Sequence, residues 1–325
     1  MIHSVLHALG VFFGHLASVQ WKWLAIGVGC HLCKLVAVSR AWRNIVKAAY
    51  PDRPVRWPQM FGAYAAGTGV NAIIPARGGD VVRLFLAKRR IEGSTYTTLV
   101  STSLLQTLFV MAVAGCFILW AVTQNVLPGI RVLRKPGLPA LDYDWAFRHP
   151  TAGLILFGLL LLFGTALVAW VAERVDRFKV KVAQGFAALG DRSYYVRRVV
   201  FWQVLDWSLR LATVFFFLRA FGIPGTLHNA LLVQVSQSLA TVFPVSPGGI
   251  GTEQALLVYI FRHVTSKSVA LSFSVGMRIT LIIVNAVVGF TAILLMTGTL
   301  HVRRAAEADR AGGEPARAKA SDGRG

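Results

Sequence analysis

Long apolar stretches without charged residues dominate the chain and predict membrane-spanning helices. Four stretches, residues 93–130, 149–172, 220–252 and 279–302, contain no Lys, Arg, Asp or Glu. A helix needs about 20 apolar residues to cross the hydrocarbon core of a bilayer. The apolar residues run on without the alternation that marks a membrane β-strand. The pattern therefore predicts an all-α polytopic membrane protein, and it excludes soluble enzymes, secreted disulfide scaffolds and outer-membrane barrels.

The hydrophobic pattern divides the chain into three parts. Residues 1–21 place apolar side chains at helical spacing and predict an amphipathic helix in the membrane interface. Residues 22–300 form a single transmembrane domain with about 5–6 full spans. Residues 301–325 are polar and basic and predict a disordered cytoplasmic tail. The clearest spans are expected near residues 23–46, 96–123, 151–171, 199–221 and 269–300.

Two further apolar segments, residues 57–87 and 227–261, are interrupted by proline and glycine. The first breaks at Pro75 and Gly78–Gly79, and the second breaks between Pro244 and Gly251. A full crossing by residues 57–74 would place the basic triplet at residues 88–90 outside, against the positive-inside rule. We therefore predict two opposed re-entrant helical hairpins that form a pseudo inverted repeat. The alternative is that each break is a simple kink.

The charge balance fits a membrane protein better than a nucleic-acid-binding one. The formal net charge is +20, with 55% hydrophobic and 15% charged residues. Most basic residues flank apolar runs on the expected cytoplasmic side, as the positive-inside rule and anionic lipid would produce. We therefore expect no nucleic-acid partner, a place in the cytoplasmic (inner) membrane and a cytoplasmic C-terminus.

The first break carries a candidate anion site. Arg77, Asp80 and Arg83 are spaced three apart, so they share a face if a helix begins near Gly78. Asp80 then neutralises one arginine and leaves the other for an anion. The helix N-terminus offers N–H groups and the positive end of the dipole. Gly78 and Gly79 have no side chains and let a headgroup approach the backbone.

The second break repeats this logic. Pro247 ends one helix, Gly248, Gly249 and Gly251 permit unusual backbone dihedrals, and Glu253 lies in the first turn of the next helix. A carboxylate in a first turn suits the helix dipole, so Glu253 has a capping role as its simpler interpretation. The functional alternative has Glu253 contact a cationic substrate group or pair with Arg77 or Arg278.

Asp80, Asp206 and Glu253 are the acids expected at membrane depth, where an ionised side chain is costly and normally has a partner. Asp206 and Arg210 are four residues apart on a helix and predict a mainly structural ion pair. Together with Arg278 they form a candidate intramembrane ion-pair set. The sequence contains no zincin, nucleophile-elbow or Walker motif. We therefore expect no enzymatic activity, no cofactor and no metal site.

Both breaks resemble the membrane region of lysylphosphatidylglycerol synthases, a family of flippase-like proteins. The matching stretches are Asn71–Arg83 and Phe243–Glu253, and the resemblance spans most of residues 20–300. It implies a bacterial or archaeal inner-membrane protein that moves a polar lipid between leaflets. It also implies that Arg77, Asp80, Arg83 and Glu253 occupy positions that the family keeps polar.

The chain departs from this family in three places. Asp80 stands where Glu is common, and residues 101–106 read Ser-Thr-Ser-Leu-Leu-Gln where a Glu-Arg pair is common. The second departure bears on substrate identity and on transport itself. The soluble aminoacyl-transfer domain of the full synthases is also missing, so we expect no synthesis of lysyl lipids.

Three functional hypotheses follow. The leading one is a flippase or transporter whose partner is a membrane lipid, either a phospholipid or a polyprenyl- or hopanoid-type lipid. The first alternative is a non-transporting accessory subunit of a lipid or glycan pathway, bound to a biosynthetic enzyme or to further copies of itself. The second alternative is an intramembrane enzyme that acts on lipid headgroups.

Overall fold

The computed structural model describes residues 19–74, 78–123, 176–242 and 251–297. Across these ranges the regular elements are all helices, as expected. The predicted interfacial helix over residues 1–21, except for its last three residues, and the predicted tail over residues 301–325 lie outside the described residues. The predicted span over residues 151–171 lies outside them as well.

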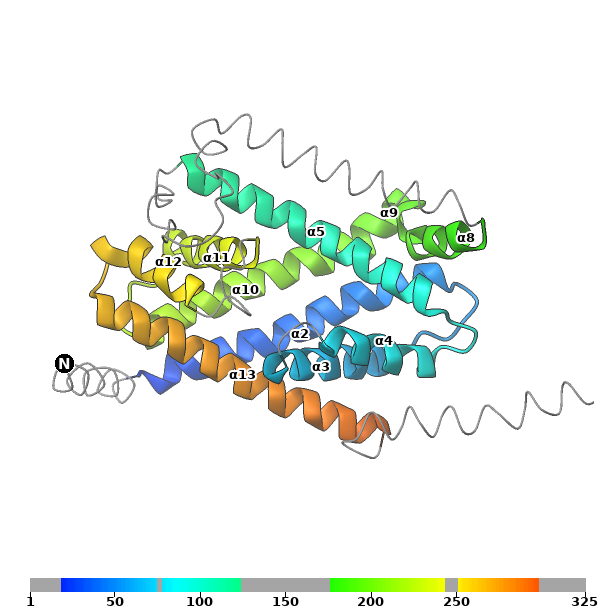
Figure 1. The fold of residues 1–325 in the computed structure, drawn as a ribbon, viewed down its shortest axis with the longest axis horizontal. Coiled ribbons are helices and arrows are strands. Elements are labelled where there is room, and N and C mark those ends of the chain that lie inside the picture. Colours follow the sequence, from blue (N-terminus) through cyan, green and yellow to red (C-terminus); the bar gives the residue numbers. More distant parts are fainter. Residues whose placement is uncertain (1–18, 75–77, 124–175, 243–250, 298–325) are drawn as a thin grey trace, which may run out of the picture.

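Four long helical segments run the length of the molecule (Figure 1). They are α2 (Trp21–Ala49), α5 (Tyr96–Thr123), α10 (Phe201–Ala220) and α13 (Lys267–Thr297). The short α9 (Arg192–Tyr194) and the π-helical η3 (Tyr195–Val200) extend α10 toward its N-terminus. All four segments are long and apolar enough to cross a membrane, and they coincide with the four predicted spans that can be compared.

Two pairs of shorter helices lie between the long ones. The first pair is α3 (Trp57–Ile73) and α4 (Gly78–Arg90), and the second is α11 (Leu227–Val242) and α12 (Thr252–Ile260). The order long, short, short, long therefore occurs twice along the chain. In Figure 1 one pair lies in one half of the elongated molecule and the other pair lies in the opposite half. The remaining elements are α8 (Asp176–Gly185), η2 (Ala187–Leu189) and η5 (Phe261–His263).

The two helical pairs approach the middle of α13 from its two ends. Gly62 faces Met296 and Gly69 faces Gly289, so α3 starts beside the C-terminal end of α13 and runs antiparallel to it. From the other end, Glu253 at the start of α12 contacts Arg278. Both breaks are thus near the middle of the bundle. This is the arrangement expected of opposed hairpins, while their insertion from opposite faces of a membrane stays a prediction.

The first half of the chain, α2 to α5, and the second half, α10 to α13, pack closely against each other. α2 and α10 pack antiparallel, with the Gln20 N–H donating to the Ala220 carbonyl at 2.9 Å. The first hairpin packs through α3 against α13 of the second half, and α11 packs against α5 of the first half. Gly69 and Gly289 approach so closely that a Cβ on either would overlap the other's backbone.

One end of the bundle gathers basic segments that are distant in sequence. The Thr95 N–H donates to the Tyr50 hydroxyl at 3.0 Å, and Gln184 donates to the Ala49 carbonyl at 2.8 Å. These bonds hold the α4–α5 connection and α8 beside the C-terminal end of α2. The exposed triplet at residues 88–90 therefore lies at the same end as the basic residues 47–56.

Candidate functional site

The start of α4 is tied to α3 by a side-chain cap. The Gly79 N–H donates to Asn71 Oδ1 at 2.8 Å, and Asn71 Nδ2 donates to Asp80 Oδ1 at 3.2 Å. A Cβ on Gly79 would overlap the Gly67 carbonyl, so this glycine is needed for close packing of the two helices. The side chain of Asn71 therefore already accepts from the Gly79 N–H, one of the helix N-terminal groups that we expected to bind an anion. Gly78 begins the helix, and Arg77 lies outside the described residues.

Arg83, one turn further along α4, lies in an aromatic cage. Its guanidinium carbon is 3.8 Å from the centre of the Trp42 ring and 4.6 Å from that of Tyr64. Its NH2 group donates to Gln106 Oε1 at 2.9 Å, while its buried Nε has no hydrogen-bond partner in the described part of the chain. Side chains from three helices, α2, α3 and α5, therefore hold the guanidinium in place, and its Nε–H remains available as a donor.

Within the described part of the chain Arg83 has no direct ion-pair partner, although Asp80 on the same helix interacts with it electrostatically. Asp80 is exposed and bonded to Asn71, and among the described residues no acidic side chain forms an ion pair with Arg83. A guanidinium that is stacked on aromatic faces presents its N–H donors as a rigid fork, which is suited to binding phosphate or carboxylate. Arg83 was predicted from the sequence, but Trp42 and Tyr64 were not, because aromatic residues in an apolar run give no separate signal.

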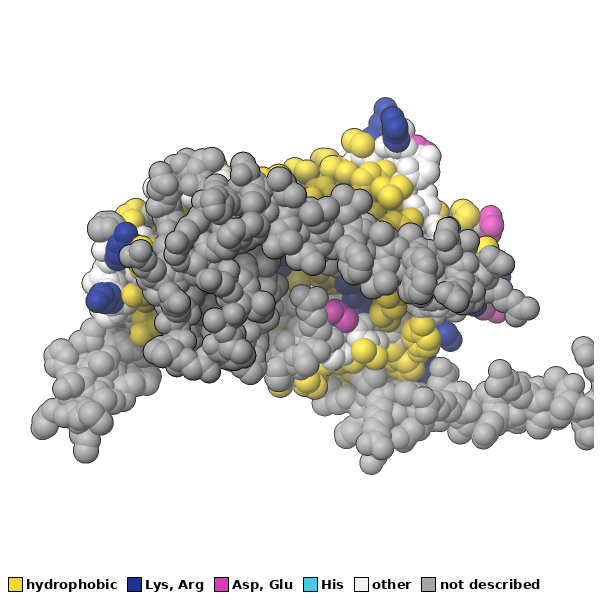
Figure 2. Space-filling view, turned by 45° about the horizontal axis from the view of Figure 1, so that its top comes forward, with side chains coloured by type: hydrophobic (Ala, Val, Ile, Leu, Met, Phe, Trp, Pro, Cys, Tyr) yellow, Lys and Arg dark blue, Asp and Glu magenta, His cyan; other side chains and the backbone are white. Residues whose placement is uncertain are grey.

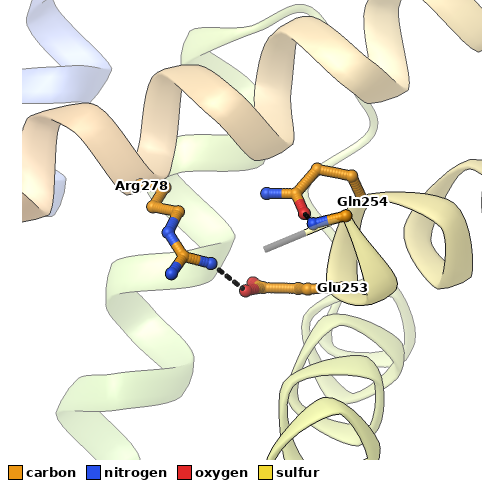
Figure 3. Close-up of polar contacts among 4 residues, drawn as sticks. Glu253, Gln254 and Arg278 are labelled. Atoms are coloured by element: carbon orange, nitrogen blue, oxygen red, sulfur yellow. Dashed lines mark hydrogen bonds and ion pairs between the residues drawn. The ribbon is translucent and has the colours of Figure 1, made fainter. Parts of the chain in front are cut away.

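The second hairpin has an ion pair at the start of α12. Arg278 of α13 donates to Glu253 Oε2 at 3.4 Å (Figure 3). Gln237 of α11 also bonds the carboxylate. Gly251 has a φ of 90°, which favours glycine, and its N–H donates to Gln254 Oε1 at 2.7 Å. The helix cap is therefore provided by Gln254, and Glu253 makes one of its two predicted arginine contacts. Pro247, Gly248 and Gly249 lie outside the described residues.

A third polar cluster lies at the middle of α2 and α10. Asp206 is 2% exposed and interacts electrostatically with Lys34 and Arg210. Within the described ranges, Asp206 forms no direct ion pair with Arg210, and Arg278 pairs with Glu253 instead of joining this set. Beside them His31 shares a hydrogen bond of 2.8 Å with Asn285 of α13. Lys34 was not predicted as a site residue, although a lysine inside an apolar span was the available signal.

The described residues give these clusters no evident metal-binding character. No group of three or more His, Cys, Asp or Glu side chains within the described ranges lies close enough to hold a metal ion. Figure 2 shows basic and acidic side chains side by side near the middle of one long face, with hydrophobic side chains around them. The site is therefore a set of charged and amide side chains within an apolar helical bundle.

Comparison with known proteins agrees with this architecture. A family model described as the lysylphosphatidylglycerol synthase TM region matches residues 10–289. No curated protein and no solved structure matches the chain. The match and the four apolar helices together establish a helical membrane protein related to lipid modification or transport. The chain belongs to the lysylphosphatidylglycerol synthase TM region family.

Proposed function

We propose that the protein moves a lipid with an anionic or polar headgroup between the two leaflets of the cytoplasmic membrane. The observation that carries this proposal is the pair of short-helix hairpins whose breaks approach the middle of α13 from its two ends. Paired interrupted helices in the two halves of a membrane protein are typical of transporters, whose substrate sites lie at the repeat interface.

Arg83 is the group proposed to bind the headgroup. Its position on α4 of the first hairpin puts a fixed positive charge inside the bundle, and Trp42 and Tyr64 keep the guanidinium in place. A charge in an apolar environment is costly to maintain, so intramembrane charges are kept mainly for function. The acyl chains would stay in the bilayer while the headgroup passes between the hairpins.

The packing of each hairpin on the other half of the chain supports a mechanism of alternating access. Each hairpin packs on a long helix of the other half, so a rocking motion of one half would move both hairpins together. This motion would open the interior first toward one leaflet and then toward the other. Glu253 and Arg278, which join α12 to α13, would have to separate or move as a unit during the change.

The test is a translocation assay with the full chain in vesicles of phosphatidylcholine that contain headgroup-labelled phosphatidylglycerol. A membrane-impermeant reagent that destroys the label in the outer leaflet reports the rate of exchange. We expect Arg83→Gln to slow exchange about tenfold or more, since hydrogen bonds to charged groups contribute about 1.5–3 kcal/mol. Arg89→Gln, an exposed change on the same helix, is the matched control and should leave the rate unchanged.

Three outcomes would contradict the proposal. Vesicles with the wild-type protein could exchange labelled lipid no faster than protein-free vesicles, which would favour an accessory role. The Arg83→Gln and Arg89→Gln proteins could instead exchange lipid at equal rates, which would remove Arg83 from the site. A chemically altered lipid recovered after incubation with the wild-type protein would point to an enzyme.

A further inference from the structure

One face of α10 concentrates buried polar atoms that have no hydrogen-bond partner in the described part of the chain. Gln203, Asp206, Trp207 and Arg210 follow one another at helical spacing and lie on the same side of the helix. The unpaired atoms are both amide atoms of Gln203, Asp206 Oδ1, Trp207 Nε1 and Arg210 Nε. Gln203 and Asp206 are 2% exposed, and Trp207 is 6% exposed.

This face requires a polar occupant. More than nine in ten buried polar groups in proteins have a hydrogen-bond partner, and an unpaired buried group costs about 1–3 kcal/mol. Five such atoms on one helical face are too many to be incidental. A molecule that enters the bundle, either a group of ordered waters or a ligand, would satisfy these atoms.

The surroundings of this face are positively charged. Lys34 of α2 and Arg210 of α10 both interact with the Asp206 carboxylate, so two cations face one anion. His31 lies on the same stretch of α2 and is bonded to Asn285. The Trp207 ring packs edge-on against Phe117 of α5, with 5.2 Å between ring centres. The excess positive charge favours an anionic occupant over a cationic one.

We infer that the α10 face formed by Gln203, Asp206, Trp207 and Arg210, with Lys34 of α2, is a second binding station for a phosphate ester at the middle of the bundle. This inference rests on the proposed function and deepens it. Arg210, Lys34 and the Trp207 N–H supply donors for the phosphate oxygens. Asp206 and the Gln203 carbonyl accept hydrogen bonds, so the ester should carry hydroxyl or ammonium groups.

The station and the Arg83 cage share helix α2. Arg83 stacks on Trp42, which is about 12 Å along α2 from Lys34 at the usual helical rise. Gln106 accepts from Arg83 and donates to the Val38 carbonyl at 3.3 Å, between those two levels of α2. A headgroup released by Arg83 therefore meets the next cationic side chains within the length of one phospholipid headgroup and its hydration shell.

Equilibrium binding tests the station without requiring transport. The full chain in phosphatidylcholine nanodiscs is titrated separately with phosphatidylglycerol, with glycerol phosphate and with inorganic phosphate. We expect Lys34→Met and Arg210→Met each to weaken binding of the phosphate group about tenfold. Arg210→Lys should retain most of the affinity, since it keeps the charge. The matched controls are Lys267→Met and Arg192→Met, which are exposed near the ends of the bundle and should bind like the wild type.

Asp206→Asn gives the most discriminating result. Removing the single carboxylate leaves two cations, so the affinity for a phosphate group should rise severalfold, opposite in direction to Lys34→Met. A purely structural role for Asp206 would instead weaken binding in both variants, and that result would overturn the inference. Unchanged affinity in Lys34→Met and Arg210→Met would overturn it as well.

The probes and the transport assay separate the remaining outcomes. Binding of phosphatidylglycerol alone identifies a lipid headgroup as the occupant, whereas equal binding of inorganic phosphate identifies free phosphate. Charge-dependent binding in a protein that exchanges no lipid would support the station and contradict the transport proposal. Lipid exchange that is unaffected by Lys34→Met would support the transport proposal and contradict the station.

Discussion

At the residue scale, charged side chains inside the bundle are each held by a different set of partners. Arg83 lies between two aromatic rings, Glu253 contacts an arginine and an amide, and Asp206 lies close to two cations without a direct ion pair. A buried charge needs compensation from its surroundings. The Glu253–Arg278 contact is the one direct ion pair that these described clusters provide, and it connects α12 with α13.

We predict that Glu253→Gln lowers the stability of the protein by about 2 kcal/mol, because it leaves the arginine partly uncompensated. The two side chains are 27% and 14% exposed, for Arg278 and Glu253 respectively, so solvent screens the pair only in part. The double variant Glu253→Gln, Arg278→Met should recover much of this loss. A thermal unfolding series on the two single variants and the double variant measures the coupling. Strictly additive losses would show that the pair contributes no coupling.

The sequence predicted individual charged residues better than their surroundings. Arg83, Glu253 and Asp206 were selected because charges are rare in apolar runs, and all three lie inside the helical bundle. The partners Trp42, Tyr64 and Gln106 come from three different helices, and their convergence depends on tertiary packing that a single sequence does not specify. Gln106 did fall in the stretch where the chain departs from the family pattern.

At the element scale, the first hairpin is positioned by backbone contacts between glycines. Gly69 of α3 and Gly289 of α13 meet with no room for a Cβ on either, so the two helices pack at their minimum separation. Small residues at such crossings are typical of membrane helices, where close packing replaces the hydrophobic effect as the driving force.

Gly289→Ala should therefore separate α3 from α13 and destabilise the protein by about 1–3 kcal/mol, as overpacking does. Gly115→Ala is the matched control, since a Cβ there meets no atom within 4 Å. The control should be neutral or stabilising, because alanine favours the helix over glycine by about 1 kcal/mol. The midpoints of thermal unfolding of both variants in the same lipid measure this difference in stability. Equal midpoints would mean that the crossing tolerates a wider separation.

The long helices were predictable and their packing partners were not. The spans starting near residues 23, 96, 199 and 269 follow from hydropathy alone, and the structure has helices over all of them. The breaks at Pro75 and Gly251 were visible as proline and glycine clusters. The pairing of α3 with α13 was not visible, because a contact between residues more than 200 positions apart leaves no mark on local periodicity.

At the scale of the whole molecule, the arrangement of the basic segments indicates how the bundle is oriented in the membrane. Residues 47–56 and 88–90 lie at one end of the bundle, and Lys22 and Lys267 belong to helix starts toward the other end. In a membrane, the positive-inside rule would turn the first end toward the cytoplasm.

Cysteine labelling in intact cells tests this orientation. Single cysteines at Arg53, Lys88 and Arg192 should be protected from an impermeant thiol reagent, while cysteines at Gly222 and Lys267 should react. The background variant must first lose Cys30, Cys33 and Cys116, which are all free thiols. Opposite labelling of Arg53 and Lys88 would mean that residues 57–87 cross the membrane completely and form no re-entrant hairpin.

The interlocking of the two halves has a consequence for biogenesis. The α3–α4 pair finds its main packing partner, α13, at the far end of the chain. A ribosome adds about 5–20 residues per second, so the early pair waits on the order of tens of seconds before that partner leaves the exit tunnel. During this interval the glycine-lined surface of α3 lacks its final neighbour. Insertion machinery that shelters half-inserted helices would thus be a requirement of this architecture, and truncation before residue 267 should leave a nascent protein that quality-control proteases remove.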